Sequence, residues 1–426
     1  MISNKDSALI IDLLHREVIP AIGCTEPIAV AFAVARATEL LGEEPEKIDV
    51  QLSANVLKNA MGVGIPSTGM TGLPIAIALG STVGRSEYGL EVLRDVTPEA
   101  VAEAKGIIES GKIDISLGEE STDKLYIKVS LSANDHTAQV IIATGHTNII
   151  FESKDGEVLL DKTSNTNTEE QEEQTVELSM RRVYDFAMQT PVESLRFILE
   201  SKRLNLGAAQ AALNGTFGHN VGRLMAGEVF GKTTFTKILA YTSAACDARM
   251  AGAMIPVMSN SGSGNQGIAA TLPVVIYAQE HSASEEQLIR ALTLSHLTVI
   301  YMKEKLGRLS AMCGCVVAAT GSSCGVTYLM GGEYPQITYA VKNMVANLTG
   351  IICDGAKPSC ALKISSGVST AIISAVMAIE GSCVSSVEGI IDDDVDKCIE
   401  NLTIIGSDAM NITDGYVLDI MTSKGC

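Results

Sequence analysis

The sequence contains no tryptophan, and only 4% of its 426 residues are aromatic. A core built on large rings is therefore excluded, and the 38 glycines indicate helices that pack closely through small side chains. Positive charge is also scarce, because 31 Lys and Arg stand against 50 Asp and Glu, a formal net charge of -19. This charge argues against nucleic acid or an anionic membrane surface as a partner and favours a small-molecule substrate.

The sequence also lacks long apolar runs. Residues 1–8 are polar and lack the apolar segment of a signal peptide. The best apolar stretches, Leu73–Gly80 and Ile268–Gln279, are short, so we expect no membrane span. We therefore expect a cytoplasmic protein, whose ten cysteines are metal ligands, catalytic groups or small buried residues rather than disulfides.

The periodicity of apolar residues divides the chain into two regions. Helical spacing over 6–19 and 27–41 is followed by β-branched segments with a period of two, and after about residue 176 helical patterns dominate. Residues 161–175 are polar and acidic, which predicts a solvated linker. We therefore predict an α+β protein, with an α/β domain containing a mixed or antiparallel sheet over 1–165 and an all-helical domain over 176–426. The predicted strands are "KIDVQLS", "KIDISLG", "KLYIKVSL" and "TAQVIIATG", and "ESKDGEV" predicts a hairpin turn.

The thiols form no CxxC pair, which is the commonest spacing in structural zinc sites, whereas the ligands of iron–sulfur clusters can be widely spaced. In "ICDGAKPSCALK", one continuous helix would hold Cys353 and Cys360 roughly 10 Å apart. Gly355 and Pro358 favour instead a helix that ends near Cys353, a tight turn, and a second helix with Cys360 in its first turn. The positive end of that helix would favour a thiolate. This pattern favours metal or cluster ligation over two buried thiols.

Several long segments together resemble the L-cysteine desulfidase family, whose helical half is similar to the α-domain of bacterial iron–sulfur L-serine dehydratases. The resemblance runs from about residue 17 to the end of the chain. The segments that carry it are "GCTEPIAVA", "IPSTGMTGLPIA", "TGHTNI", "SNSGSGNQG", "RLSAMC" and "CDGAKPSCALK".

The resemblance implies a [4Fe–4S] cluster with one open iron and with Cys313, Cys353 and Cys360 as ligands. Cys315 offers a competing register for Cys313, and Cys324 is expected in the core. The implied reaction is β-elimination of L-cysteine to sulfide, ammonia and pyruvate, without pyridoxal phosphate. An L-serine or L-threonine dehydratase on the same scaffold and a non-catalytic metal or redox sensor remain open, as does a homo-oligomer.

The loop "SNSGSGNQG" suits a carboxylate, because its backbone N–H groups and short polar side chains precede an apolar helix. A plain helix–helix turn fits the residues equally well, and the resemblance favours substrate binding. The expected contacts with the amino-acid substrate are Ser261, Ser263, Asn265 and Gln266.

Cys24 in "GCTEP" lies just before a helix, where its pKa could be lowered. Two roles are open for it, acid/base catalysis or a fourth cluster ligand. His146, after a strand, and Lys363, after Cys360, are further catalytic residues suggested by position. Asp247 and Arg249 in "CDARM" predict a structural ion pair, and the terminal "TSKGC" reads as a frayed tail.

Overall fold

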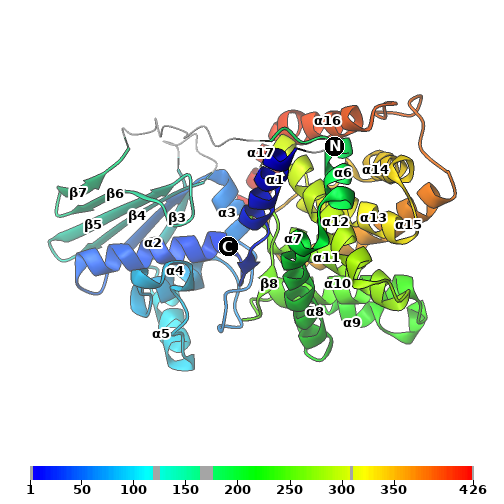
Figure 1. The fold of residues 1–426 in the computed structure, drawn as a ribbon. Coiled ribbons are helices and arrows are strands. Elements are labelled where there is room, and N and C mark those ends of the chain that lie inside the picture. The colour runs from blue at the N-terminus through cyan, green and yellow to red at the C-terminus, as the bar shows by residue number, and fades with distance from the viewer. Residues whose placement is uncertain (1–2, 119–124, 164–175, 308–309, 425–426) are drawn as a thin grey trace.

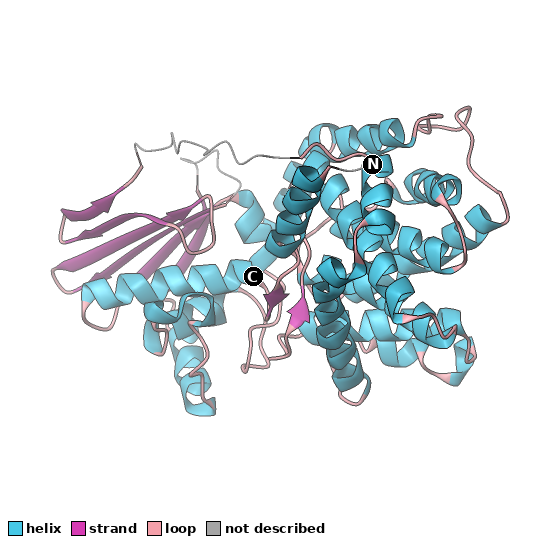
Figure 2. Cartoon of the chain, in the orientation of Figure 1, coloured by secondary structure: helices cyan, strands magenta, loops and turns pink. Residues whose placement is uncertain are grey.

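A computed structural model describes residues 3–118, 125–163, 176–307 and 310–424 of the chain. A region with one large sheet lies beside a larger region built of helices (Figures 1 and 2). The predicted α+β organisation is thereby confirmed. Most of the predicted linker and the C-terminal Cys426 lie outside the described residues.

The sheet region contains six strands in the order β3-β2-β4-β5-β6-β7. Strands β2 and β3 are parallel and the other neighbours are antiparallel, so the sheet is mixed. Helix α2 lies along one face and contacts β4 and β5 (Figure 1). The elements are α2 (Thr25–Leu41), β2 (Lys47–Leu52), α3 (Ala54–Ala60), α4 (Leu73–Thr82), the 3₁₀ helix η1 (Ser86–Glu91), α5 (Pro98–Glu109), β3 (Ile113–Leu117), β4 (Tyr126–Ala133), β5 (His136–Ala143), β6 (Ile149–Lys154) and β7 (Glu157–Asp161).

Alternating residues of the strands build the core of this region. Ile127, Val129 and Leu131 of β4 are buried with the apolar residues of α2 and α4. A Cβ added at Gly80 would lie 2.6 Å from the carbonyl oxygen of Ala31, so α2 and α4 pack as closely as the glycine content predicts. All predicted strands are present, and the predicted hairpin turn joins β6 to β7.

The helical region is organised around α10, α11, α13 and α15, which contact one another. Its elements are α6 (Met180–Gln189), α7 (Val192–Leu195), η2 (Arg196–Ile198), α8 (Leu199–Leu213), α9 (Val221–Met225), η3 (Glu228–Phe230), α10 (Thr234–Met250), β8 (Val257–Met258), α11 (Gly264–Glu280), α12 (Glu285–Leu306), α13 (Gly314–Leu329), α14 (Tyr334–Leu348), α15 (Cys360–Ile379), α16 (Val395–Ile404), the π-helix η4 (Ile405–Ala409) and α17 (Asn411–Thr422).

Both ends of the chain cross between the regions. Helix α1 (Asn4–Glu17) buries Ile10 and Leu14 in the helical core, and β1 (Pro20–Ala21) pairs with β8. At the other end, Leu418 of α17 packs into the core of the sheet region. The domain division at 1–165 and 176–426 stays a prediction. Helix α1 precedes that division but packs in the helical core, and α17 follows it but packs against the sheet region.

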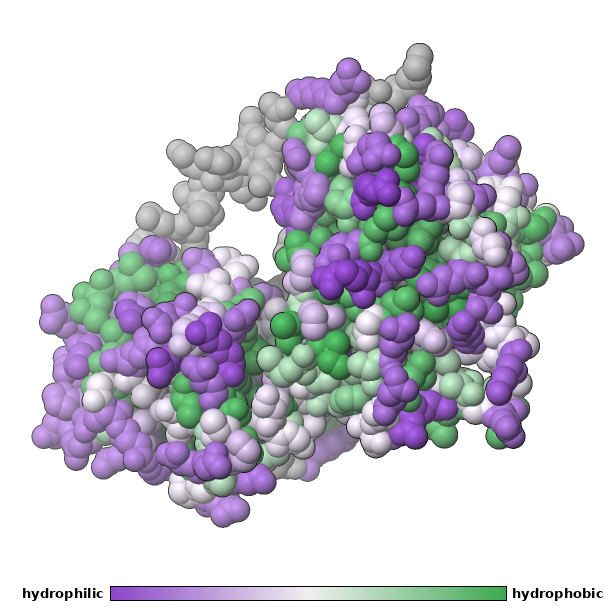
Figure 3. All heavy atoms as spheres, turned by 60° about the horizontal axis from the view of Figure 1, so that its bottom comes forward, coloured by the Kyte–Doolittle hydropathy of each residue, from purple (hydrophilic) through white to green (hydrophobic). Residues whose placement is uncertain are grey.

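Helix α15 corrects the expectation that no segment is apolar enough to span a membrane. Its 20 residues pass that test by length and composition, and half of the apolar window is buried inside the protein. Because a core helix passes the same test, this is weak evidence for a membrane. On the face shown in Figure 3, hydrophilic and apolar residues are interspersed over both regions.

Candidate functional site

One cavity collects most of the residues that the sequence singled out. Its volume of about 150 Å³ is small beside the roughly 300–1,000 Å³ of pockets for drug-sized ligands. Residues from the start of α2, from α3, from the ends of α10 and α12 and from the starts of α11, α13 and α15 line it. The lining comprises Cys24, Glu26, Asn55, Lys58, Asn59, Arg249, Ser261, Gly262, Ser263, Asn265, Gln266, Lys303, Ser310, Met312, Cys313, Gly314, Cys315, Cys353, Gly355, Ala356, Cys360 and Ile364.

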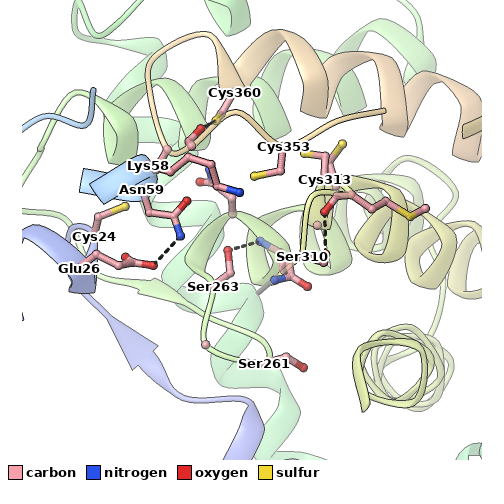
Figure 4. A pocket seen from close by; sticks show the side chains of 18 of the residues that line it. Cys24, Glu26, Lys58, Asn59, Ser261, Ser263, Ser310, Cys313, Cys353 and Cys360 are labelled. Atoms are coloured by element: carbon pink, nitrogen blue, oxygen red, sulfur yellow. Dashed lines mark hydrogen bonds between the residues drawn. The ribbon is translucent and has the colours of Figure 1, made fainter. Parts of the chain in front are cut away.

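The three predicted ligands all face this cavity (Figure 4). Cys313 caps α13 and Cys360 is the first residue of α15. The N–H of Cys353 donates to Ala311 O at 2.6 Å and that of Cys313 to Ile351 O at 2.9 Å, so two short backbone bonds fasten their loops together. The thiols of Cys313 and Cys353 are hydrogen-bonded to each other. The sequence predicted a helix that ends near Cys353, but α14 ends at Leu348. Cys353 lies instead in a loop, where its N–H is bonded to Ala311 O.

Gly355 forms the turn between Cys353 and Cys360. Its φ of +87° is one that side-chain-bearing residues rarely adopt, and an added Cβ would lie 2.0 Å from the carbonyl oxygen of Lys58. The thiol loop of the helical region is therefore pressed onto the end of α3 in the sheet region. Only glycine fits this contact without a shift of the backbone.

The predicted lowering of thiol pKa values at helix N-termini is wrong for both cysteines. Burial raises the pKa of Cys24 to about 11, although the nearby Arg249 lowers it. Burial also raises the pKa of Cys360, against the backbone N–H and lysine charges near it. Loss of water outweighs the partial charge of a helix end, because a thiolate without solvent is costly.

The donor set fits a cluster better than a single ion. No group of three His, Cys, Asp or Glu side chains converges closely enough to hold one metal ion anywhere in the described ranges. Cys313, Cys353 and Cys360 line one cavity, and the ligands of a [4Fe–4S] cluster need not converge on one point because each binds a different iron. Cys315 also lines the cavity and is hydrogen-bonded to Cys313, so both registers remain open.

The glycine-rich loop lies beside the thiols. Ser263 caps α11 by accepting a hydrogen bond from the N–H of Gln266 at 3.4 Å. The hydroxyl of Ser261 donates to Asn260 Oδ1 at 2.8 Å, and its side chain lies apart from the thiols in Figure 4. Ser263, Asn265 and Gln266 are thus better placed than Ser261 to reach a small molecule near the thiols.

Arg249 is a site residue that the sequence reasoning missed. Its Nη1 donates to Asn265 Oδ1 at 3.1 Å, and its guanidinium lowers the pKa of the nearby Cys24 thiol. The expected ion pair is wrong, since Asp247 instead accepts a hydrogen bond from the N–H of Gly222 at 3.0 Å. An arginine in the apolar stretch "AACDARM", close in sequence to a glycine-rich loop, was the available signal.

Two buried polar atoms in this cavity lack a hydrogen-bond partner among the described residues, Arg249 Nε and Gln266 Oε1. Two glycines make room for them. A Cβ on Gly264 would lie 2.3 Å from Arg249 Nε, and one on Gly314 would lie 2.9 Å from Gln266 Cδ. Because unpaired buried polar atoms are costly, a donor and an acceptor left open in one cavity indicate a place for a polar ligand.

The opposite wall carries Glu26, Lys58 and Asn59, with Asn59 Nδ2 donating to Glu26 Oε1 at 3.3 Å. The cavity is lined by three basic residues, Lys58, Arg249 and Lys303, and by one acidic residue, Glu26, and of the basic residues Lys58 is paired with Asp414. In a chain with a net charge of -19, this local excess of positive charge favours an anionic occupant.

Comparison with known proteins identifies the family. The serine dehydratase alpha chain family matches residues 87–419. A UPF0597 protein of Phocaeicola vulgatus is 64% identical over the full length of both chains, and UPF0597 protein BF3560 of Bacteroides fragilis is 65% identical, also over the full length of both. A UPF0597 protein of Oleidesulfovibrio alaskensis is 45% identical over 97% of each chain.

The chain is a UPF0597 protein. Its serine dehydratase alpha-chain domain indicates a lyase-type enzyme from an iron–sulfur family. The matched residues include Arg249, the glycine-rich loop and all three predicted ligands, whereas Cys24, Glu26, Lys58 and Asn59 precede the match. The wall from the helical region therefore lies within the match to the serine dehydratase alpha chain family, and the wall from α2 and α3 lies outside it.

Two predicted catalytic residues of the UPF0597 protein are not brought into the cavity. His146 lies half-buried in the turn between β5 and β6, within the sheet region. Lys363 pairs with Asp354 and donates to Ile352 O at 2.9 Å, so it braces the loop of Cys353 from outside. Burial raises the pKa of Asp354, but Lys357 and Lys363 outweigh it and lower the pKa to about 2. Cys324 is fully buried, as expected of a core thiol.

Proposed function

We propose that this UPF0597 protein is an L-cysteine desulfidase. The observation that carries the proposal is the cavity itself, which brings Cys313, Cys353 and Cys360 together with Cys24 and with the open Nε of Arg249. The first three would hold a [4Fe–4S] cluster, and the last two act on an amino acid beside it. The proposal includes a cytoplasmic location and a small amino-acid substrate.

The reaction consumes L-cysteine and water and yields sulfide, ammonia and pyruvate. The Cα–H and Cβ–S bonds break, the electron pair of the first forms a C=C bond, and the sulfur leaves with the pair of the second. The resulting aminoacrylate tautomerises to an imine, which water hydrolyses to pyruvate and ammonia. When bound, the cluster supplies an open iron as a Lewis acid for the leaving sulfur.

Arg249 holds the α-carboxylate of the substrate. Its guanidinium can donate from Nε, which has no partner among the described residues, while Nη1 stays fixed by Asn265. Gln266 Oε1, the second open atom, can accept from the substrate ammonium. Charge-assisted bonds of this kind orient the Cα–H bond toward the opposite wall of the cavity.

Cys24 is the acid–base group on that opposite wall. It is buried, it lines the cavity together with Arg249, and the charge of Arg249 acts on its thiol, which supports a place next to the proposed carboxylate site. Its raised pKa keeps the thiol protonated at neutral pH in the free protein. Glu26 lies in the first turn of the helix that Cys24 precedes, and it is the one carboxylate among the described residues that line the cavity, so we assign removal of the α-proton to it.

A dehydratase acting on L-serine or L-threonine is the second candidate, supported by the serine dehydratase alpha-chain domain. Both reactions need the same ligands and carboxylate site, and they differ in the leaving group. A non-catalytic sensor is less well supported, because sensing does not require open polar atoms beside the thiols.

The test is to purify the protein anaerobically, measure its iron and acid-labile sulfide, and compare L-cysteine with L-serine. We expect about four irons and four sulfides per chain. Sulfide release from L-cysteine should proceed with a kcat/KM at least tenfold above that for pyruvate formation from L-serine. Zinc without acid-labile sulfide would overturn the cluster, and faster turnover of L-serine would establish the dehydratase.

A further inference from the structure

Lys58 is a buried lysine in the cavity wall. Its side chain is 3% exposed, and it belongs to the last turn of α3 in the sheet region. A lysine is almost never this buried without a purpose or a partner. Its partner is Asp414 of α17, with which it forms an ion pair.

The surroundings of Lys58 place its charge beside the cluster thiols. Its carbonyl oxygen contacts Gly355, in the turn that separates Cys353 from Cys360, and Lys58 lines the same cavity as both thiols. Figure 4 shows Lys58 between Asn59 and Cys353. Lys58 therefore places a positive charge in the cavity of the thiols, where a substrate sulfur would leave in the proposed function.

The ion pair with Asp414 fixes the position of this charge. The C-terminal segment formed by η4 and α17 touches both parts of the site. Asp414 of α17 pairs with Lys58 of α3, and the π-helix η4 packs against the thiol loop. A Cβ added at Gly406 in that π-helix would lie 3.0 Å from Met312 Cε, beside Cys313. Asp414 is thus a positioning residue, held by the same segment that supports the thiol loop.

A cation here distinguishes sulfur from oxygen. The thiol of cysteine has an ordinary pKa of about 8.5, so a nearby ammonium can favour its anion, whereas the hydroxyl of serine stays neutral. Arg249 and the glycine-rich loop are occupied with the carboxylate end of the substrate in the proposed function. Lys58 is left to face the β-substituent, from the wall that precedes the serine dehydratase match.

We propose that Lys58, held by Asp414, is the residue that selects a sulfur leaving group over a hydroxyl. This inference rests on the proposed function, since it presumes that L-cysteine is the preferred substrate. It assigns the choice of substrate to a residue that takes no part in holding the cluster.

The experiment compares kcat/KM for sulfide release from L-cysteine with kcat/KM for pyruvate formation from L-serine, in anaerobically reconstituted full-length protein of known iron content. Lys58→Met should lower the ratio of the two at least tenfold, mainly through L-cysteine. Lys58→Arg keeps the cation and should stay within about threefold of the unaltered protein. The matched control for Asp414→Asn is Asp419→Asn, which alters an exposed aspartate on the same helix α17 and should leave both kcat/KM values unchanged.

Removing one partner of a buried pair can itself destabilise a protein. The double variant Lys58→Met/Asp414→Asn leaves neither charge unpaired and should show the same low ratio. Equal losses for both substrates, or an unchanged ratio in Lys58→Met and in the double variant, would overturn the role of Lys58. An unaltered protein that prefers L-serine would instead reject the proposed function, before any variant is considered.

Discussion

The two walls of the cavity are built differently. The wall from the helical region carries the thiols on loops joined by backbone hydrogen bonds, and it lies within the part that matches serine dehydratases. The wall from α2 and α3 carries Cys24, Glu26, Lys58 and Asn59, and it precedes that part. Under the proposed function, this difference assigns cluster binding and the choice of substrate to separate segments of one chain.

The largest expected effect comes from the helical wall. Cys353→Ala should abolish the iron content and with it all sulfide release, because the remaining thiols cannot complete the ligand set. Iron analysis and the visible absorption spectrum of anaerobic protein measure this. Cys324→Ala, in the core of α13, is the matched control and should retain its iron. Full iron in Cys353→Ala would mean that another thiol, such as Cys315, is the ligand.

Arg249 comes second, since it belongs to the same wall without being a ligand. Arg249→Gln should retain its iron but lose about 2–4 kcal/mol of transition-state stabilisation, roughly 30- to 1,000-fold in kcat/KM. Steady-state kinetics with L-cysteine test this, and Arg203→Gln on the exposed face of α8 serves as control. A loss of iron in Arg249→Gln would show that the arginine supports the cluster rather than the substrate.

The next prediction concerns Cys24, on the wall from α2 and α3. Cys24→Ser should keep the full iron content while kcat falls by roughly 10²-fold, the scale of a lost general acid or base. Iron content, absorption spectrum and kcat are to be measured on the same preparation. A variant that loses iron would make Cys24 a fourth ligand, and unchanged activity would leave it a buried thiol with no role in catalysis.

The contact between the walls should respond to Gly355→Ala. The added Cβ meets the carbonyl of Lys58, and the positive φ disfavours alanine, so the free energy of unfolding should fall by about 1–3 kcal/mol. Denaturant unfolding measures this change. Gly350→Ala has no atom within 4 Å of its Cβ and is the control. Equal stability of the two variants would contradict the close contact of thiol loop and α3.

The smallest effect is expected outside both walls. Lys363→Met removes a partly exposed ion pair with Asp354, which should cost at most about 1 kcal/mol of stability and less than twofold in kcat. His146→Ala should likewise change kcat by less than twofold, because His146 does not line the cavity. A tenfold loss of kcat in either variant, with iron retained, would show that the altered residue takes part in catalysis.

The strands could be predicted because a period of two is a local property of the sequence, and β2 to β7 follow it. The packing of α1 could not, since its partners, such as Phe197 and helix α12, lie far along the chain. The ion pair of Asp247 and Arg249 was a wrong prediction for a simple reason. Residues two apart on a helix do not face each other, so Asp247 turns to α9 and Arg249 to the cavity.

Lys58 was missed because a buried lysine and an exposed one look alike in a sequence. Its burial depends on Gly355 and Asp414, which are distant in sequence. The grouping of Cys313, Cys353 and Cys360 was predictable mainly through the family resemblance. The raised pKa values of Cys24 and Cys360 were not, because burial is a property of the whole fold.

The pairing of β1 with β8 has a consequence for how the protein is made. Pro20 and Ala21 lie opposite Met258 and Val257, so the segment just before Cys24 meets its partner only after more than half of the chain has left the ribosome. The sheet region can fold while it waits, since domains form as units during synthesis. The segment before Cys24 is then among the last to be fixed in place, and Cys24 reaches its position in the cavity only after the helical region has formed.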